Sequence, residues 1–456
     1  MENNKMYKFL NYVQYTVIVI AFSMLFGWFT SNVYQGNFLA SEQMQSIRNC
    51  FINFTSFPNK ISQTVTYLKG TNYFEVVDTK DIEVINKLDK DLYITNAIYE
   101  DKQYTFFLKN LKTDEIIHKW HFSSENFKGE QINFNQFFPQ SVTLLEDMSI
   151  VAMLAGSKNI FRLDKDSNIM WINQNHYFHH SIERGNDGIW TCISNLVKFK
   201  NNSENNWHLY RNDEIAKLDI DTGKIIFKKS LTELFEENNL EHYLYGFAFN
   251  DHGVTNQATP EDYHDGFHLN DVQPALKNSA YYNEGDVFIS IRNNSRILHY
   301  RPKTNTLIQV IEGSFFQQHD VDIISDHEIS IFNNNRPTIP SFSTTDNIVG
   351  DYEVITNTNA PKFKSSQVVV YNLATKQFTF PLKDQLEEQK IYTNLQGVHH
   401  TLSDKSIFIE PTYEGIFYLF KNQELIYRNY ANPRNRKGNF EMPHWVKVYE
   451  NLDFIK

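Results

Sequence analysis

The sequence predicts an all-β fold: a six-bladed β-propeller with long insertions between strands, preceded by one N-terminal transmembrane helix. Helical periodicity is nearly absent beyond about residue 65, hairpin patterns recur six times, and an almost wholly apolar segment lies near the N-terminus. Short alternating strands separated by turn-forming residues are typical of antiparallel meanders. Aromatic residues, which suit strands, make up 15% of the 456 residues.

The apolar segment reads VQYTVIVIAFSMLFGW (13–28). Lys5 and Lys8 precede it, and the next basic residue is Arg48. Such a charge bias places the N-terminus in the cytoplasm. We therefore expect a cytoplasmic end at 1–12 and a single-pass anchor at 13–32, with the remaining chain outside the cytoplasm, periplasmic or extracellular. A cleaved signal peptide is the alternative, although no small-x-small site follows the apolar run.

The repeat is a two-part unit. Its first part is a hairpin with a polar turn, at 141–154, 180–193, 319–335 and 400–411. Its second part is another hairpin, at 104–120, 159–172, 214–227, 296–311, 368–380 and 415–427. Two hairpins make the four strands of a propeller blade, so the sequence predicts six blades, or seven if an N-terminal unit escapes recognition. Long insertions fall at 232–283 and 336–362. Residues 33–64 are assigned to a linker or packing segment and 65–456 to the propeller.

Composition restricts the function. A net charge of −11 and a pI near 5.8 argue against nucleic-acid binding, which usually requires a basic face. Cys50 and Cys192 are far apart and have no metal-binding spacing, so no cysteine-held metal or iron–sulfur cluster is expected, and whether they pair cannot be read from spacing. No cofactor is predicted, and a homodimer is left open.

Histidines recur at one place in the repeat. When the first-part strands are superposed, His180, His268, His319 and His400 share a position, and Gln140 takes it in an earlier copy. The first strand of each blade lines the central channel, so these side chains should form a ring at one end of it. Arg292 closes the second strand of its unit and should project toward the same end. An arginine fork suits an oxyanion such as sulfate or phosphate.

Four motifs in order, HHSI (179–182), FHLNDV (267–272), GDVFISIRN (285–293) and QHDVD (318–322), resemble those of the bacterial arylsulfotransferases. The resemblance spans roughly residues 90–430. Members of that family are exported six-bladed propellers that move a sulfuryl group from a phenolic sulfate ester to a phenol without a nucleotide sulfate donor. The resemblance thus implies small-molecule aryl sulfate and phenol substrates for this chain.

Carried over residue by residue, the resemblance makes His319 the nucleophile that is transiently sulfated. His268 and Arg292 would bind the sulfuryl oxygens, and His180 would complete the cage, with His179 as the neighbouring choice. Weaker substrate-binding candidates are His400, Asn270 and Glu410. The chain departs from the family in its membrane anchor and in lacking a close-spaced cysteine pair, and His400 matches no family role.

Further expectations concern the surroundings of the ring. Strand alternation should point Asp320 away from His319, toward a loop or the adjoining blade. An acid from across the channel, Glu410 or Asp271, should orient the His319 ring. Aromatic residues of 243–282 are expected to pack, with a wall for an aryl group as the alternative.

Two other functions stay open on sequence grounds. The histidine ring could hold a metal for a metal-dependent propeller enzyme, since imidazole and carboxylate are common ligands. A membrane-anchored binding module, with incidental histidines, is the non-enzymatic alternative.

Overall fold

The structure is a computed structural model. It describes the backbone of residues 2–34, 38–39, 42–55, 75–76, 81–100, 103–123, 138–155, 157–201, 206–245, 263–264, 266–336, 365–433 and 440–455. The chain divides into two compact units. The first comprises Met1–Asn72 with Lys198–Leu209 and Gly253–Tyr263, and the second comprises Tyr73–Val197, Tyr210–His252 and His264–Lys456.

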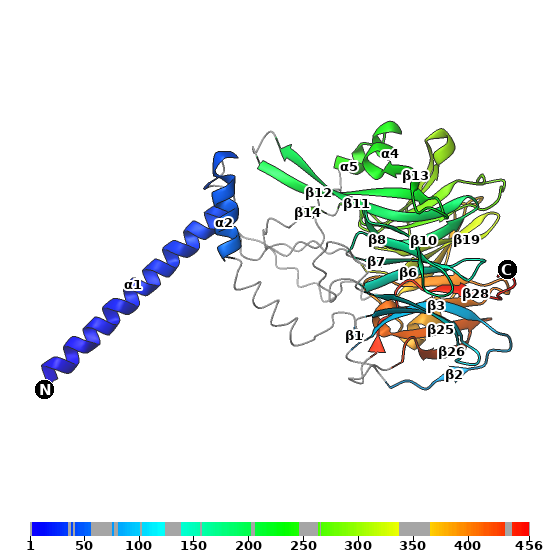
Figure 1. Cartoon of the computed structure of the whole chain (residues 1–456), viewed down its shortest axis with the longest axis horizontal. Helices are drawn as coiled ribbons and strands as arrows, with labels where there is room; N and C mark the ends of the chain where they lie inside the picture. Colours follow the sequence, from blue (N-terminus) through cyan, green and yellow to red (C-terminus); the bar gives the residue numbers. More distant parts are fainter. Residues whose placement is uncertain are drawn as a thin grey trace. The chain divides into compact units, whose positions relative to one another are not determined.

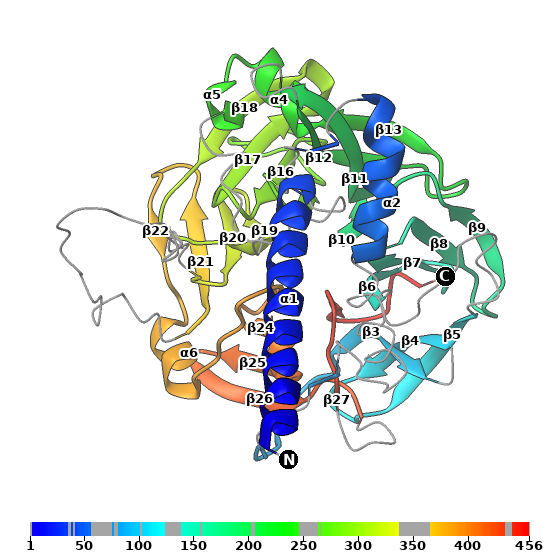
Figure 2. The ribbon, with the colours of Figure 1, turned by 90° about the vertical axis from the view of Figure 1, so that its left-hand side faces the viewer.

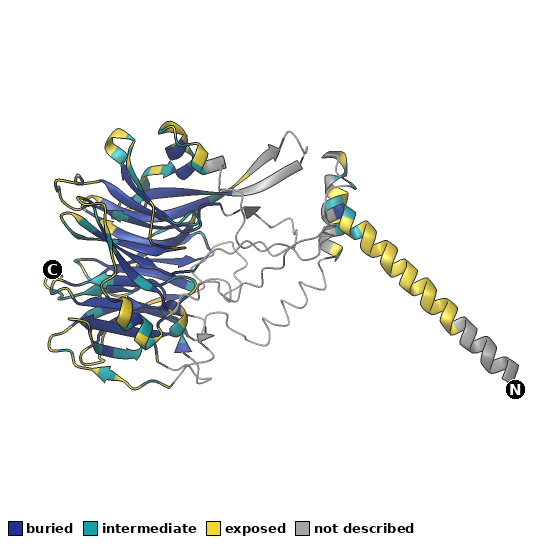
Figure 3. Ribbon diagram, turned by 180° about the vertical axis from the view of Figure 1, so that it is seen from behind, coloured by how far each residue is buried: buried dark blue, intermediate teal, exposed yellow. Residues whose placement is uncertain are grey.

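The first unit contains the long N-terminal helix α1 (Glu2–Tyr34). Its segment Tyr12–Val33 has 22 residues with a mean hydropathy of 1.6, which is long and apolar enough to cross a membrane. Most of its described side chains are exposed (Figure 3). Helix η1 (Glu42–Met44) and helix α2 (Gln45–Thr55) follow within the predicted linker, and Phe29 of α1 meets Phe51 of α2 with ring centroids 5.3 Å apart.

The second unit is a six-bladed β-propeller, as predicted, and Figure 1 labels many of its strands. Figure 2 shows its sheets arranged around a central axis. The second blade contains β6 (Phe138–Leu144), β7 (Ile150–Ala155), β8 (Asn159–Leu163) and β9 (Ile169–Asn173). The third contains β10 (Tyr177–Gly185), β11 (Gly188–Asn201), β12 (Asn206–Leu218) and β13 (Ile225–Ser230), with β14 (Tyr263–His264) paired to β12.

The next three blades follow in chain order. The fourth contains β15 (Leu269–Pro274), β16 (Val287–Ile291), β17 (Arg296–Arg301) and β18 (Thr306–Ile311). The fifth contains β19 (His319–Ser325), β20 (Glu328–Asn333), β21 (Gln367–Asn372) and β22 (Phe378–Thr379). The sixth contains β23 (Val398–Thr401), β24 (Ile407–Glu410), β25 (Ile416–Lys421) and β26 (Glu424–Tyr430), with β2 (Ile85–Asn86) on its outer edge.

The first blade joins the two ends of the propeller chain. Its strands β3 (Tyr93–Glu100), β4 (Gln103–Asn110) and β5 (Ile116–Ser123) come from the N-terminal side. Its innermost strand, β28 (Lys447–Tyr449), comes from the C-terminal end and pairs antiparallel with β3. This pairing closes the ring of blades, and it also carries the segment just before β28 to the central axis. The two-stranded antiparallel sheet of β1 (Glu75–Val76) and β27 (Phe440–Glu441) also joins residues from the two ends of the propeller chain.

The core lies between neighbouring blades. Strands that face another blade on both sides are buried along their whole length, as in β7, β8 and β16. Between the first two blades, Phe122 and Phe161 stack with centroids 3.9 Å apart. Apolar contact of this kind, repeated at each blade junction, holds the inner strands at fixed positions about the axis.

Helices mark the described parts of the insertions. Helix α4 (Leu231–Glu237) begins at Ser230, whose hydroxyl accepts a hydrogen bond from the Glu233 N–H, and α5 (His242–Tyr245) follows. The short 3₁₀ helices η3 (Pro302–Thr304) and η4 (Thr412–Glu414) and helix α6 (Lys383–Gln389) lie in later connections. Residues 246–262 and 337–362, which include much of both predicted insertions, lie outside the described residues. In the described part, Tyr282 is buried and donates to the Ser325 carbonyl, which is a packing role.

Candidate active site

Four of the predicted site residues meet at the central axis. One ring nitrogen from each of His180, His268 and His319 lies within 4.8 Å of the others. The His180 ring centroid is 5.2 Å from that of His268 and 5.9 Å from that of His319. Arg292 is 8% exposed, and its charge contributes to lowering the pKa of His319. The predicted grouping of three imidazoles beside a guanidinium is therefore present.

Irregular strands, rather than regular alternation, aim these side chains. The inner strands have register breaks between Pro139 and Ser141, His179 and Ile182, Leu269 and Asp271, and His319 and Val321. His180 and His268 have positive φ values of 63° and 53°. A β-bulge re-aims a side chain and is common beside active sites. The bulges therefore set the histidines toward the axis.

The inner strands are tied together by a repeated hydrogen bond, which fixes their true alignment. The Ser181 hydroxyl, the Asp271 carboxylate and the Asp320 carboxylate each accept from the backbone N–H of the next blade, at Val272, Val321 and His399. On this alignment His180 and His319 are equivalent, as predicted. The equivalent residue in the fourth blade is Asn270 and not His268, which lies two positions earlier. The prediction that His268 shares the repeat position is wrong, although its side chain still joins the group.

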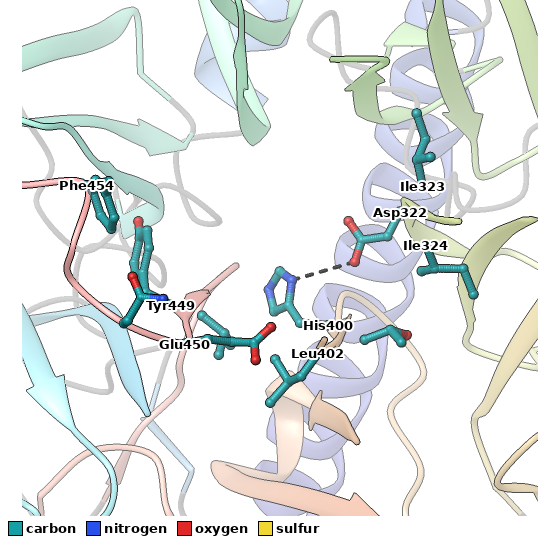
Figure 4. Close-up of a pocket in the computed structure, with 11 residues that line it drawn as sticks. Asp322, Ile323, Ile324, His400, Leu402, Tyr449, Glu450 and Phe454 are labelled. Atoms are coloured by element: carbon teal, nitrogen blue, oxygen red, sulfur yellow. Dashed lines mark ion pairs between the residues drawn. The ribbon is translucent and has the colours of Figure 1, made fainter. Parts of the chain in front are cut away.

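His400 does not belong to this group. On the same alignment it is equivalent to Asp322, three residues beyond His319 along the inner strand. Its Nε2 lies 2.9 Å from the Val446 carbonyl, and its Nδ1 lies 3.6 Å from the Asp322 carboxylate. It lines a cavity of about 380 Å³ with Asp322, Tyr449 and Glu450 (Figure 4). Each residue along a strand advances the chain by about 3.3 Å, and His400 is displaced from the ring position by three residues. The prediction that His400 joins the ring is therefore wrong.

Asn334 orients the His319 ring. His319 Nδ1 lies 2.6 Å from Asn334 Oδ1. The Asn334 amide is itself fixed, because its Nδ2 donates to the carbonyls of Thr393 and Gln396 at 3.1 and 2.6 Å. The amide oxygen must therefore face His319, which places the ring proton on Nδ1. The Nε2 atom of His319 consequently carries a lone pair, in agreement with the Gln396 backbone N–H that points to it at 3.3 Å.

His180 holds the opposite tautomer. Arg211 Nη2, which can only donate, lies 2.9 Å from His179 Nε2, so that nitrogen accepts. The His179 proton is then on Nδ1, which lies 2.9 Å from His180 Nδ1. His180 Nδ1 accepts this bond, so the His180 proton is on Nε2. Asp213 completes the chain, since its carboxylate accepts from Arg211 Nε at 2.9 Å. His179 is thus a positioning residue behind His180.

Burial keeps both imidazoles neutral. It lowers the pKa of His180 and of His319 well below the usual range, and the neighbouring histidines and arginines lower it further. Arg292 supplies a permanent positive charge beside them, which suits an oxyanion. Arg292 donates to the side-chain oxygens of Asn293 and Gln317 at 2.8 and 3.1 Å, which hold the guanidinium in place.

The predicted carboxylates act on backbone and not on His319. Glu410 accepts from the N–H groups of Trp445 and Val446, so it fastens the closing segment before β28. Burial raises the pKa of Glu410 to about 7. Asp271 accepts from Val272 and Val321. The expectation that Glu410 or Asp271 orients His319 is wrong, since Asn334 does so. The expectation for Asp320 is confirmed, because it binds His399 in the adjoining blade.

Several residues of the site carry no signal in the sequence. Asn334 lies in the run NNN just after β20, Arg211 lies in the long strand β12, and His444 and Trp445 precede β28. His444 and Trp445 reach the axis because the C-terminal segment closes the propeller. Cys50 is exposed and Cys192 is buried, and both are free thiols.

Comparison with known proteins agrees with this geometry. The sequence model of the arylsulfotransferases (ASST) matches residues 141–427, well over half of the chain. The search of curated proteins found no match. The similar solved structures include a catalytically inactive virginiamycin B lyase from Staphylococcus aureus with quinupristin, at 9% identity and a TM-score of 0.39 over 76% of this chain and 88% of that one.

Two further structures are similar at the same level. One is from a nidogen/laminin complex, at 7% identity and a TM-score of 0.40 over 78% of this chain and 97% of that one. The other is a functionally unknown protein from Desulfotomaculum acetoxidans, at 9% identity and a TM-score of 0.38 over 79% and 99%. These likenesses carry no argument about function. The match to the family model does carry such an argument, and its residues 141–427 include the three clustered histidines and Arg292. This chain belongs to the arylsulfotransferase family.

Proposed function

We propose that the protein is an aryl sulfotransferase that moves a sulfuryl group from a phenolic sulfate ester to a phenolic acceptor through a sulfohistidine at His319. It needs no nucleotide sulfate donor in this scheme. The observation that supports the proposal is the pair of opposed tautomers beside the cation of Arg292. His180 bears an Nε2–H, and His319 bears an Nε2 lone pair, whose long bond from the Gln396 N–H at 3.3 Å would be exchanged for the bond to sulfur. These tautomers support His319 as the nucleophile and His180 as a donor to the sulfuryl oxygens.

In the first half-reaction the His319 Nε2 lone pair attacks sulfur, and the bond from sulfur to the aryl oxygen breaks. The aryl oxygen leaves with the electron pair as a phenolate. The ring becomes an N-sulfoimidazolium, whose Nδ1–H still donates a hydrogen bond to Asn334 Oδ1. In the second half-reaction an acceptor phenol that has lost its proton to water attacks sulfur as the phenolate, and the electron pair of the nitrogen–sulfur bond returns to Nε2. A covalent intermediate divides one hard displacement into two easier ones.

The surrounding side chains stabilise the charge on the sulfuryl oxygens. Transfer of such a group resembles phosphoryl transfer, in which the protein mainly positions the reactants and stabilises the equatorial oxygens. Arg292, His268 and the His180 Nε2–H fill that role, with Asn270 at the repeat position of the fourth blade. The Asn270 Nδ2 donates to the Gln318 carbonyl at 2.8 Å, which fixes its amide.

Metal-dependent chemistry is the second candidate, because three imidazole nitrogens within 4.8 Å have a spacing suited to an ion. The tautomers oppose it. A metal requires a lone pair from each ring, but the His180 Nδ1 lone pair is taken by His179 and the Nε2 carries the proton. Metal binding at His180 would have to reverse the chain of bonds from Arg211.

A transfer assay separates these functions. Purified protein given 4-nitrophenyl sulfate and phenol should release nitrophenol with ping-pong kinetics, and EDTA should leave the rate unchanged. Lowering the pH from 7.5 to 6 should not reduce kcat/KM for the donor. The reason is that a depressed pKa keeps His319 neutral, and so nucleophilic, well below 6.5, whereas an ordinary imidazole would protonate in this interval.

Loss of the rate in EDTA, with recovery on adding a divalent metal, would support the metal-dependent reading instead. A rate that falls tenfold for each pH unit below 7 would show that the nucleophile is not the buried His319. A protein with no transfer, but with a retained partner-binding activity after the ring histidines are changed to alanine, would be the binding module.

We further propose that α1 anchors the propeller outside the cytoplasm. Lys5 and Lys8 precede the apolar segment, and basic residues are retained on the cytoplasmic side. An alkaline phosphatase domain fused to the C-terminus should be active, since that enzyme matures only after export. An inactive fusion, with a normal amount of protein in the membrane fraction, would contradict this orientation.

A further inference from the structure

Trp445 packs against the catalytic histidines. Its ring centroid lies 5.6 Å from that of His180 and 6.2 Å from that of His319, and both ring pairs meet edge to face. The side chain is 1% exposed. It comes from the closing segment before β28, so it reaches the axis from the chain end opposite to the motifs that resemble the family.

The backbone of Trp445 is held in an unfavourable conformation. Its φ is 57°, in the left-handed region that bulky residues seldom adopt. Glu410 maintains it by accepting the N–H groups of Trp445 and Val446 at 3.3 and 2.9 Å. Strained residues of this kind collect at functional sites, where the surrounding structure fixes a side chain in one place.

The indole N–H of Trp445 is buried and has no acceptor among the described residues. An indole nitrogen can only donate, and a buried donor without a partner destabilises the fold. Two other buried tryptophans of the propeller are satisfied: Trp120 donates to the Met148 carbonyl at 3.1 Å, and Trp171 donates to the Ile220 carbonyl at 2.8 Å. A strained residue with an unused donor beside the nucleophile indicates that the acceptor belongs to a ligand.

We propose that the Trp445 Nε1–H donates a hydrogen bond to an oxygen of the sulfuryl group bound over His319. Trp445 is then a substrate-contacting residue, and this role rests on the proposed sulfuryl transfer. The sulfuryl oxygens are strong acceptors and carry the negative charge of the ester. They are present in the donor, in the sulfohistidine and in the product, so the bond acts in both half-reactions.

The Trp445→Phe variant tests this proposal, because phenylalanine keeps a six-membered aromatic ring and lacks the five-membered ring that carries the N–H. Loss of a hydrogen bond to a charged group should reduce kcat/KM about 10- to 100-fold, for the donor and for the acceptor alike. The substitution removes no hydrogen bond within the protein, because the Trp445 indole N–H has no protein acceptor among the described residues. Loss of hydrogen bonding should therefore not lower the melting temperature.

Trp120→Phe is the matched control. It removes an indole N–H of the first blade that donates to the Met148 carbonyl of the second blade. It should therefore lower the melting temperature and leave both kcat/KM values unchanged. The proposal is overturned if Trp445→Phe keeps the wild-type kcat/KM. It is also overturned if the loss of activity is explained by a lower melting temperature, that is, by a smaller folded fraction at the assay temperature, as for a packing defect. An active wild type with an unaffected Trp445→Phe removes this inference alone, whereas an inactive wild type removes the proposed function as well.

Discussion

Replacing His319 with glutamine should lower the rate of sulfuryl transfer by at least about 10³-fold, which is the scale expected when the nucleophile of a covalent mechanism is removed. Glutamine preserves much of the side-chain volume and can still bond Asn334, so the fold should be retained. It has no ring nitrogen to attack sulfur. Steady-state release of nitrophenol from 4-nitrophenyl sulfate, with phenol present, measures the effect.

His327→Gln provides the control for this experiment. His327 lies in the exposed turn between β19 and β20, at the far end of the same hairpin that carries His319. Its replacement removes an imidazole from the same blade without touching the site, so activity should be unchanged. A His319→Gln protein with more than a tenth of the wild-type rate would assign the nucleophile elsewhere, with His268 as the next imidazole to change.

Replacing Arg292 should have the second-largest effect. Arg292→Ala removes the fixed cation beside His319 and should lower kcat/KM for the donor by about 10²- to 10³-fold, as for loss of an oxyanion-stabilising group. Arg292→Lys keeps the charge but loses the planar fork that Asn293 and Gln317 hold, so it should recover only part of the loss. The two variants are compared in the same transfer assay.

Arg184→Lys is a suitable comparison for the arginine series. Arg184 lies near the end of β10, is partly exposed, and pairs with Glu146 at the surface, where ion pairs contribute little. It should behave as wild type. An Arg292→Lys variant with full activity would show that the site needs only a positive charge, and an Arg292→Ala variant with full activity would remove Arg292 from the mechanism.

The repeated hairpins made most of the fold predictable. Strand alternation and turn residues depend on local sequence, so the second-part hairpins at 104–120, 159–172 and 415–427 correspond to β4–β5, β8–β9 and β25–β26. The first blade was harder. Its inner strand β28 pairs with β3 from more than 350 residues away along the chain. No local pattern encodes such a partner, and the segment 447–449 is only three residues long.

The spatial grouping of the candidate residues was predictable, but its detailed geometry was not. His180, His319 and Arg292 lie together as expected, because equivalent positions of repeated blades converge on an axis, and their roles in a reaction stay predictions. The superposition of first-part strands that aligned His268 and His400 with the other histidines takes no account of bulges, where the chain adopts positive φ and an extra residue shifts the register. Asn334, Arg211 and Trp445 were missed because their roles depend on hydrogen bonds between blades, which a single sequence does not display.

The central claim is that His319 Nε2 accepts the sulfuryl group covalently. Protein given 4-nitrophenyl sulfate without acceptor, quenched and digested, should yield the peptide that contains His319 with the added mass of one SO₃ group, and phenol added before the quench should remove it. The same digest from His319→Gln should show no added mass. A modified peptide that lacks His319, or an unmodified digest from an enzyme that turns over rapidly, would contradict the mechanism.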